Sequence, residues 1–178
     1  MNQNILSAYI EEIRLSKVRR DDVPSFDPKN GNEQAKFLIV LEAPGPQAIN
    51  SGIISIENDD PTARNLRKLL DEAKIHREEV VIWNVVPWYV GNENRTQIAI
   101  PSAEDVEQGI GWLCKLVGHL KHLQCILLVG GSARKAHIRL SARTKVRILA
   151  CHHTSQRVLN ISKVADQENR DVFQFMRA

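Results

Sequence analysis

The chain has 178 residues, of which 43% are hydrophobic and 25% are charged, and its formal net charge at pH 7 is +3. This length and composition are typical of one globular domain, 1–178, and exclude a disordered or fibrous protein. No apolar run approaches the roughly 20 residues of a membrane helix, and with so small a net charge any affinity for nucleic acid requires a local basic patch.

Helices and strands are predicted to alternate, because the spacing of apolar residues switches between helical and strand periods. In chain order we predict a helix at 4–16, a strand at 37–42, a helix at 61–74, a strand at 80–85, a helix at 102–122, a strand at 125–129, a short helix ending near 140, a strand at 146–151 and a helix at 163–177. The segments 17–36 and 43–61 are predicted to be loops. An N-terminal helix and loop, 1–36, would thus precede a core of 37–178.

Capping residues indicate where two of the helices begin. Asp60 is a suitable N-cap for the helix that starts at Pro61, since proline fits the first turn. Ser102 and Asp105, three residues apart, form the pattern of a capping box before the longest helix. The strand at 37–42 is an uninterrupted apolar run up to its last residue, as expected of a strand covered on both faces.

The alternation predicts an α/β fold, a three-layer αβα sandwich with a central four-stranded parallel sheet. All strands of such a sheet end at the same edge, which is where open α/β sheets bind their ligands. Polar or conformationally unusual segments occur at the ends of the four strands, namely Glu42-Ala43-Pro44-Gly45, Asn84-Val85-Val86-Pro87-Trp88, Gly130-Gly131-Ser132 and His153-Thr154-Ser155-Gln156. We therefore expect a functional site at this edge.

These segments resemble the motifs of the uracil-DNA glycosylase superfamily, over about residues 37–160. The first resembles the G-E-A-P-G motif of one branch, with Leu41 in place of the first glycine. The second resembles N-V-V, and Asn94-Arg95 and Pro101 resemble the N-R and P that follow it. Leu128 to Ala133 resembles an L-G-x-x-A turn, and the fourth segment stands where the family has H-P-S-P.

The resemblance implies an enzyme that flips uracil or another deaminated base out of DNA and hydrolyses its N-glycosidic bond, leaving an abasic site. Asn84 would read the Watson–Crick edge, because an amide can accept from N3–H and donate to O4 of uracil. Ala43, Gly45 and Ile53 would complete the base-binding set. His153 would donate to O2, where negative charge develops as the bond breaks.

The remaining site residues implied by the resemblance contact the DNA itself. Gly131, Ser132, Thr154 and Ser155 would bind phosphates through amides and hydroxyls. Val158-Leu159 could form an apolar wedge that fills the space left by the flipped base. The basic groups Arg19-Arg20, Arg134-Lys135 and Arg143-Lys145-Arg147 are expected to be mostly solvated.

The sequence departs from the family pattern at three points. Ala43 stands where the best-known branch has a water-activating aspartate, so Glu42 is our candidate for a direct catalytic role. Ile53 or Ile54 replaces the aromatic ring that usually stacks on the uracil. The G-E-A-P-G branch often binds an iron–sulfur cluster through four cysteines, whereas this chain has three, far apart in sequence. We therefore expect no metal and no other cofactor.

The wider expectations are those of a cytoplasmic monomer that acts on DNA and does not bind membranes. The cysteines are expected to be reduced thiols, and Met1 to Asn4 does not open a signal peptide. Two other functions remain open at this point. The chain could be a non-catalytic nucleic-acid-binding member of the same fold, or an α/β protein that binds a free nucleotide or nucleoside at the same strand ends.

Overall fold

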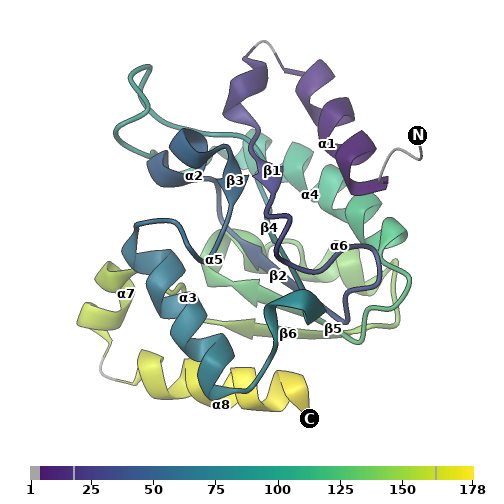
Figure 1. Ribbon diagram of the computed structural model, residues 1–178, viewed down its shortest axis with the longest axis vertical. Helices are drawn as coiled ribbons and strands as arrows, with labels where there is room; N and C mark the ends of the chain where they lie inside the picture. Colours follow the sequence, from purple (N-terminus) through teal and green to yellow (C-terminus); the bar gives the residue numbers. More distant parts are fainter. Residues whose placement is uncertain (1–4, 18, 163) are drawn as a thin grey trace.

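The computed structural model describes residues 5–17, 19–162 and 164–178 (Figure 1). Its elements in chain order are α1 (Ile5–Leu15), the 3-10 turn η1 (Arg20–Asp22), β1 (Ser25–Phe26), β2 (Phe37–Leu41), α2 (Pro46–Ser51), β3 (Ile53–Ile54), α3 (Pro61–Glu72), the 3-10 turn η2 (Arg77–Glu79), β4 (Val80–Asn84), α4 (Ala103–His119), β5 (Cys125–Val129), α5 (Gly130–Arg134), α6 (His137–Ser141), β6 (Arg147–Cys151), α7 (Gln156–Ile161) and α8 (Ala165–Arg177). Within these described residues, no helix is long and apolar enough to cross a membrane.

The central sheet has four parallel strands in the order β4-β2-β5-β6. All residues of β2, β4 and β5 are buried, which explains why their sequences are continuous apolar runs. The register pairs Leu41 with Asn84 and Val129 with Cys151, so the four strands end close to one level. The prediction of a four-stranded parallel sheet is confirmed.

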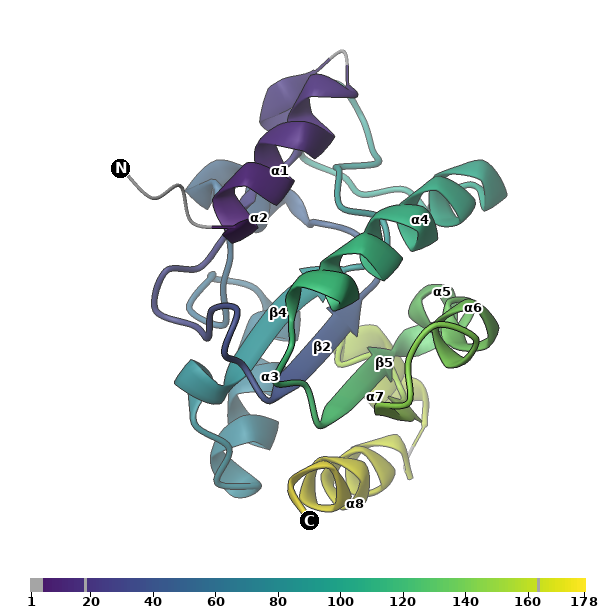
Figure 2. The same cartoon turned by 90° about the vertical axis from the view of Figure 1, so that its right-hand side faces the viewer.

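Helices cover both faces of this sheet, as the side view shows (Figure 2). One layer contains α1 and α4, which pack together, with α5 and α6 beside them. The other contains α3 and α8, with α7 at its end. The structure is therefore the expected three-layer αβα sandwich.

Residues before the central sheet pack closely on it. β1 pairs in parallel with β3, in a small sheet that lies beside β4. The ring of Phe26 stacks on Trp83 with centroids 4.1 Å apart, and Tyr9 of α1 meets the same indole edge-on. The segment 5–36 thus contributes to the same hydrophobic core as the strands.

The two predicted caps are present. The carboxylate of Asp60 accepts from the backbone N–H of Ala63 at 2.9 Å, and Ser102 and Asp105 form a reciprocal capping box. The longest helix, however, ends at His119 and not near residue 122, because Leu120 already leaves the helical conformation.

Four short elements lie where the sequence predicted loops. The segment 43–61 contains α2 and β3, and the loop before β2 contains η1 and β1. Pro46 occupies the first turn of α2, and Gly52 ends that helix in the left-handed conformation with φ of 73°. A further short helix, α7, follows the last strand-end motif.

Candidate functional site

The residues that follow β2, β4, β5 and β6 lie at one edge of the sheet (Figure 1). Backbone pairing continues past the ends of β2 and β4, since the N–H of Val85 donates to the carbonyl of Leu41 and that of Val86 to the carbonyl of Glu42. These bonds, at 2.8 and 3.0 Å, fix the Glu42 and Asn84 backbones beside each other.

Asn84 is the last residue of β4 and is buried, with 3% of its surface exposed. Its neighbour across the ladder is Leu41. Among the residues that the structure describes, none forms a hydrogen bond with the side-chain amide of Asn84. The fully buried polar side-chain atoms without a partner in the described residues belong to Asn30, Glu33 and Trp83, so the amide atoms of Asn84 still reach solvent and have donor and acceptor capacity that a ligand can satisfy.

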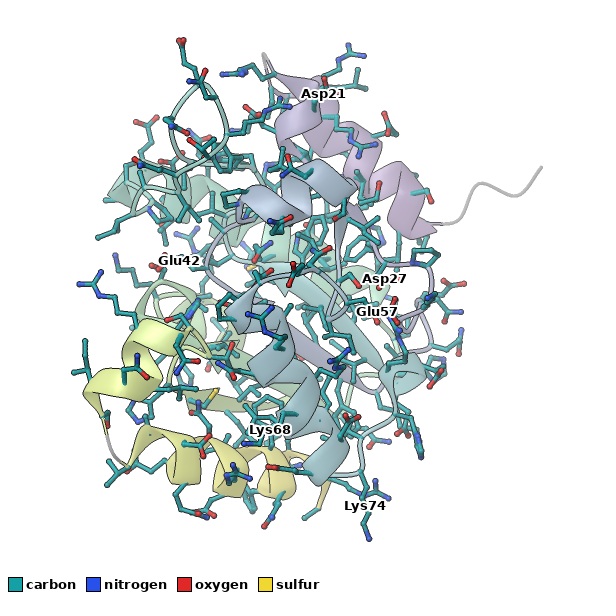
Figure 3. All side chains as sticks on the ribbon, turned by 60° about the vertical axis from the view of Figure 1, so that its left-hand side comes forward. Asp21, Asp27, Glu42, Glu57, Lys68 and Lys74 are labelled. Atoms are coloured by element: carbon teal, nitrogen blue, oxygen red, sulfur yellow. The ribbon has the colours of Figure 1, made fainter. Side chains whose placement is uncertain are left out.

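Glu42 is half-buried and lies between α2 and α7 in the view of Figure 3. Its Oε2 accepts a hydrogen bond of 2.5 Å from the hydroxyl of Ser132, in α5. Ser132, which the sequence predicts to bind a DNA phosphate, is buried, and its hydroxyl donates to Glu42. This hydrogen bond holds one oxygen of the carboxylate.

The ring of His153 packs against Gly130, the first residue after β5. Gly130 has φ of 86°, and a Cβ at this position would lie 2.9 Å from Cδ2 of His153. Glycine is therefore required both by the backbone conformation and by the approach of the imidazole. The contact brings the ends of β5 and β6 together.

The hydrogen bonding of His153 defines its tautomer. Nδ1 accepts from the backbone N–H of Ser155 at 3.1 Å, so in the neutral ring the proton resides on Nε2. Burial lowers the pKa of His153 below its ordinary value, and the negative charge of Glu42 opposes this only in part. A neutral imidazole that can donate from Nε2 is thus favoured near pH 7.

Thr154 and Ser155 continue the chain toward α7. Thr154 is completely buried, and its hydroxyl donates to the carbonyl of Thr62 at 3.5 Å. Its side chain is therefore turned toward α3. Ser155 is half-exposed at the start of α7, and Gly131 is exposed with open space around it.

The other predicted site residues lie near this edge with different exposure. Ala43 and Gly45 are half-buried, and Gly45 is the N-cap of α2. Ile53, in β3, is half-buried. Val158 and Leu159 are half-exposed on α7, and so a wedge there would be presented by a helix.

Metal ligands do not gather at this edge. Among the described residues there is no group of three or more His, Cys, Asp or Glu side chains that could hold a metal ion. Cys125 begins β5 and Cys151 ends β6, so they lie at opposite edges of the sheet, while Cys114 is in α4. Burial raises the pKa of Cys151 to about 12, which makes it a poor thiolate ligand near neutral pH.

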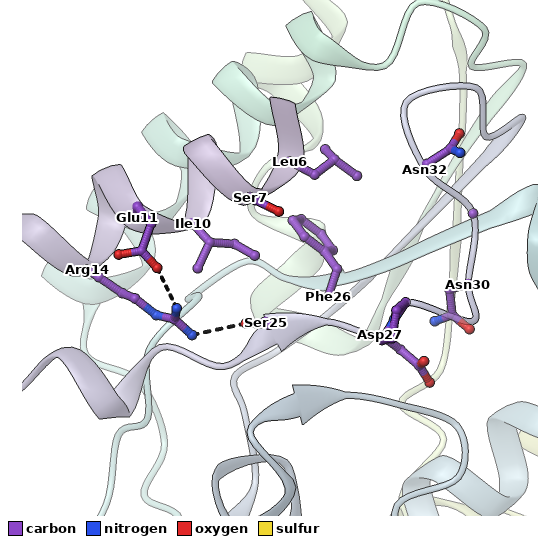
Figure 4. A pocket seen from close by; sticks show the side chains of 12 residues that line it. Leu6, Ser7, Ile10, Glu11, Arg14, Ser25, Phe26, Asp27, Asn30 and Asn32 are labelled. Atoms are coloured by element: carbon purple, nitrogen blue, oxygen red, sulfur yellow. Dashed lines mark hydrogen bonds and ion pairs between the residues drawn. The ribbon is translucent and has the colours of Figure 1, made fainter. Parts of the chain in front are cut away.

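A cavity of about 430 Å³ lies elsewhere, between α1 and residues 25–32 (Figure 4). Arg14 crosses its wall and donates to Glu11 and to the hydroxyl of Ser25. Of the described residues that line this cavity, none follows a strand of the four-stranded sheet. The cavity is therefore separate from the strand-end site.

Two asparagines at the site were not identified from the sequence. Asn65 in α3 and Asn169 in α8 both hydrogen-bond to the backbone of the loop that carries His153. Asn65 gives no signal, because it is partly exposed on an amphipathic helix. Asn169 does give a signal in the sequence, because it lies on the buried face of α8 with Ala165 and Phe173, where an apolar residue is expected.

Comparison with known proteins agrees with this architecture. A sequence model of the family described as the uracil DNA glycosylase superfamily matches residues 28–177. The solution NMR structure of a candidate uracil DNA glycosylase from Methanosarcina acetivorans is similar, with a TM-score of 0.54 and 16% sequence identity over 84% of this chain and 99% of that one. At this identity the similarity shows the fold alone. A comparison with curated proteins finds no match.

Proposed function

Because this chain belongs to the uracil DNA glycosylase superfamily, we propose that it removes uracil, or a related deaminated base, from DNA. The observation that carries the proposal is the placement of Asn84 and His153. A side-chain amide without a protein partner and a neutral imidazole with its proton on Nε2 stand at the same edge of the sheet, at the ends of its two outer strands, β4 and β6. An amide is suited to recognising the edge of a base, and a neutral imidazole N–H is suited to stabilising a leaving anion.

In this mechanism the target base leaves the DNA stack and enters the edge of the sheet between Ala43 and Ile53 on one side and Asn84 on the other. The Asn84 amide accepts from N3–H and donates to O4 of uracil. Cytosine presents the opposite pattern, so it would leave the buried amide mismatched, at a cost of about 1–3 kcal/mol. The wall at Ile53 is aliphatic and contributes burial without ring stacking.

The bond between C1′ and N1 then breaks, and its electron pair moves onto the base. Nε2–H of His153 donates to O2, where much of this charge collects, and so stabilises the uracil anion in the transition state. Water adds to C1′, and Glu42, held by Ser132, accepts its proton. The products are the free base, which is reprotonated, and an abasic site.

DNA binding in this proposal differs from the simplest expectation for the family motifs. Gly131 and Ser155 would contact phosphates, and Val158 and Leu159 would enter the vacated stack, which is supported by the partial or full exposure of all four residues. We assign Thr154 and Ser132 to the support of the loop and of Glu42, because their hydroxyls already donate within the protein.

The test is an excision assay on a uracil oligonucleotide, single- and double-stranded, with alkaline cleavage to reveal abasic sites and a thymine oligonucleotide as the control. Product from the uracil strand only is expected. Tight binding without product would favour a non-catalytic DNA-binding member. Affinity for a free nucleotide without DNA affinity would favour the metabolite-binding alternative. Hypoxanthine and xanthine substrates define the range of bases.

A further inference from the structure

The backbone of His152 is paired with a side chain where a neighbouring strand would otherwise lie. β6 is an edge strand, with β5 on one side only. Just beyond its end, the N–H of His152 donates to Oδ1 of Asn169 at 2.9 Å, and the carbonyl of His152 accepts from Nδ2 of the same amide at 3.3 Å. One side chain thus satisfies both backbone groups of one residue.

This pairing explains why an asparagine occupies the interior of α8. Asn169 is completely buried, in the middle of a helix whose other inward side chains include Phe173 and Met176. A buried amide is unfavourable unless its donor and acceptor are both used, and here both are used on His152.

A second asparagine holds the residue on the other side of His153. Nδ2 of Asn65, in α3, donates to the carbonyl of Thr154 at 2.8 Å. The buried Thr154 adds its own contact to the carbonyl of Thr62 in the same helix. The chain is therefore fixed immediately before and immediately after His153, from two helices of one layer that pack on each other.

His153 is left with little freedom between these two attachments. Its ring rests on Gly130, and its Nδ1 accepts from the N–H of Ser155. The direction of Nε2–H follows from the backbone positions of His152 and Thr154. A displacement of about 1 Å in such a group can reduce a reaction rate by about 100-fold.

We propose that Asn169 and Asn65 are positioning residues, which clamp the backbone on both sides of His153 and thereby aim its Nε2–H at the leaving base. That Nε2–H of His153 is directed at a base rests on the proposed function. The clamp itself concerns only this chain and has a readout that does not require catalysis.

Asn65→Ala is the main variant, because Asn65 is partly exposed and its removal leaves the core intact. Asn169→Ser is the second, and Gln167→Ala is the matched control, since Gln167 is an exposed amide on α8 that contacts Asp171. In protein labelled with ¹⁵N-histidine, His153→Gln identifies the His153 signals by their loss.

The parent is expected to show His153 as the Nε2–H tautomer. In Asn65→Ala the ring nitrogens should shift toward a mixture of tautomers, with the His153 pKa moved toward its ordinary value, while Gln167→Ala stays like the parent. Single-turnover excision should fall about 10-fold, with DNA affinity changed by less than about 2-fold. In a His153→Ala background, Asn65→Ala should lower the rate by less than about 2-fold, because both act through one group.

Unchanged His153 nitrogen shifts in a folded Asn65→Ala protein overturn the proposal. So does a rate loss of the same size with and without His153, because it would indicate a general structural role. If the parent excises no uracil from DNA, the proposed function fails, and the nitrogen shifts alone still decide whether the asparagines position the ring.

Discussion

The hydroxyl of Ser132 donates a hydrogen bond of 2.5 Å to Oε2 of Glu42, and so joins the turn after β5 to the end of β2. A serine at this strand end resembles a phosphate ligand in the sequence. In the structure this serine is hydrogen-bonded to Glu42, the carboxylate that follows β2. If the hydroxyl binds a phosphate, its removal should weaken DNA binding. If it orients Glu42, its removal should slow the reaction.

Ser132→Ala should reduce the single-turnover rate of uracil excision about 10-fold, because a hydrogen bond to a charged group contributes roughly 1.5–3 kcal/mol. DNA affinity and its dependence on salt should stay near those of the parent. Ser155→Ala is the comparison, since Ser155 is accessible and should affect affinity more than rate. Weaker binding of Ser132→Ala at an unchanged rate would assign the hydroxyl to a phosphate instead.

Asn84 and His153 should be separable by kinetics. His153→Ala should lower the single-turnover rate by on the order of 100-fold while leaving DNA affinity nearly unchanged, because its hydrogen bond strengthens only as charge develops. Asn84→Asp should weaken recognition of uracil, since a carboxylate cannot donate to O4. Excision by His153→Ala at the parental rate would remove His153 from the mechanism.

The lowered pKa of His153 predicts a pH dependence. Because the folded protein binds this proton less readily than the unfolded chain, the contribution of His153 to stability is complete above an ordinary pKa of 6.5 and is lost as pH falls toward the lowered value. Protonation also removes the Nδ1 acceptor used by Ser155. Between pH 7.5 and 5.5 the parent should lose more stability than His153→Gln, as measured by urea unfolding, and its excision rate should fall below pH 6.5. Parallel stability profiles would contradict this assignment.

A buried ion pair ties the segment before β2 to the start of β4. Arg77 donates to Asp27 at 2.7 Å and to Glu57 at 2.6 Å, and Asp27, labelled with Glu57 in Figure 3, also accepts from Ser55. Arg77→Ala should lower the free energy of unfolding by about 3 kcal/mol, because the buried carboxylate loses its countercharge.

Arg64→Ala is the matched control for that substitution. Its pair with Asp59 is exposed on both sides, so its loss should cost less than about 1 kcal/mol in the same urea titration. Equal effects of the two substitutions would mean that the Asp27 ion pair is no more important than a surface contact.

Cofactor chemistry gives the last prediction. Cys125 and Cys151 lie at opposite ends of the sheet strands, and Cys114 lies in α4, so the three thiols cannot surround one cluster. The purified protein should be colourless, and EDTA should leave its thermal unfolding unchanged. A visible absorption band that bleaches on reduction would show that a cluster is bound.

The sequence was informative where local chemistry decides structure. The apolar run of β2, the cap at Asp60 and the box at Ser102 each depend on neighbouring residues, and all three are present. α2 was missed because Pro46 interrupts a strand and begins a helix equally well. β1 and β3 were missed because two-residue strands have no measurable period.

The site was predictable only in part for a related reason. That Glu42, Asn84, Gly130 and His153 share one edge follows from the parallel direction of the four strands alone. The hydrogen bonds from Ser132 to Glu42, and from Asn65 and Asn169 to the His153 loop, join residues far apart in the chain. No local pattern encodes such pairs, and only the interior position of Asn169 in its helix indicates one of them.

The strand order also determines how this chain must fold. β2 lies between β4 and β5, so Phe37 pairs on one side with Val80 and on the other with Cys125. Such parallel pairings close long loops before any contact compensates for the lost chain entropy, which makes folding slow. Until β5 pairs with β2, one side of the entirely apolar strand β2 is unpaired and can form hydrogen bonds with other unfolded chains. Substitutions within Phe37–Leu41 should therefore reduce the yield of folded protein through slow refolding and aggregation, before they change anything at Glu42.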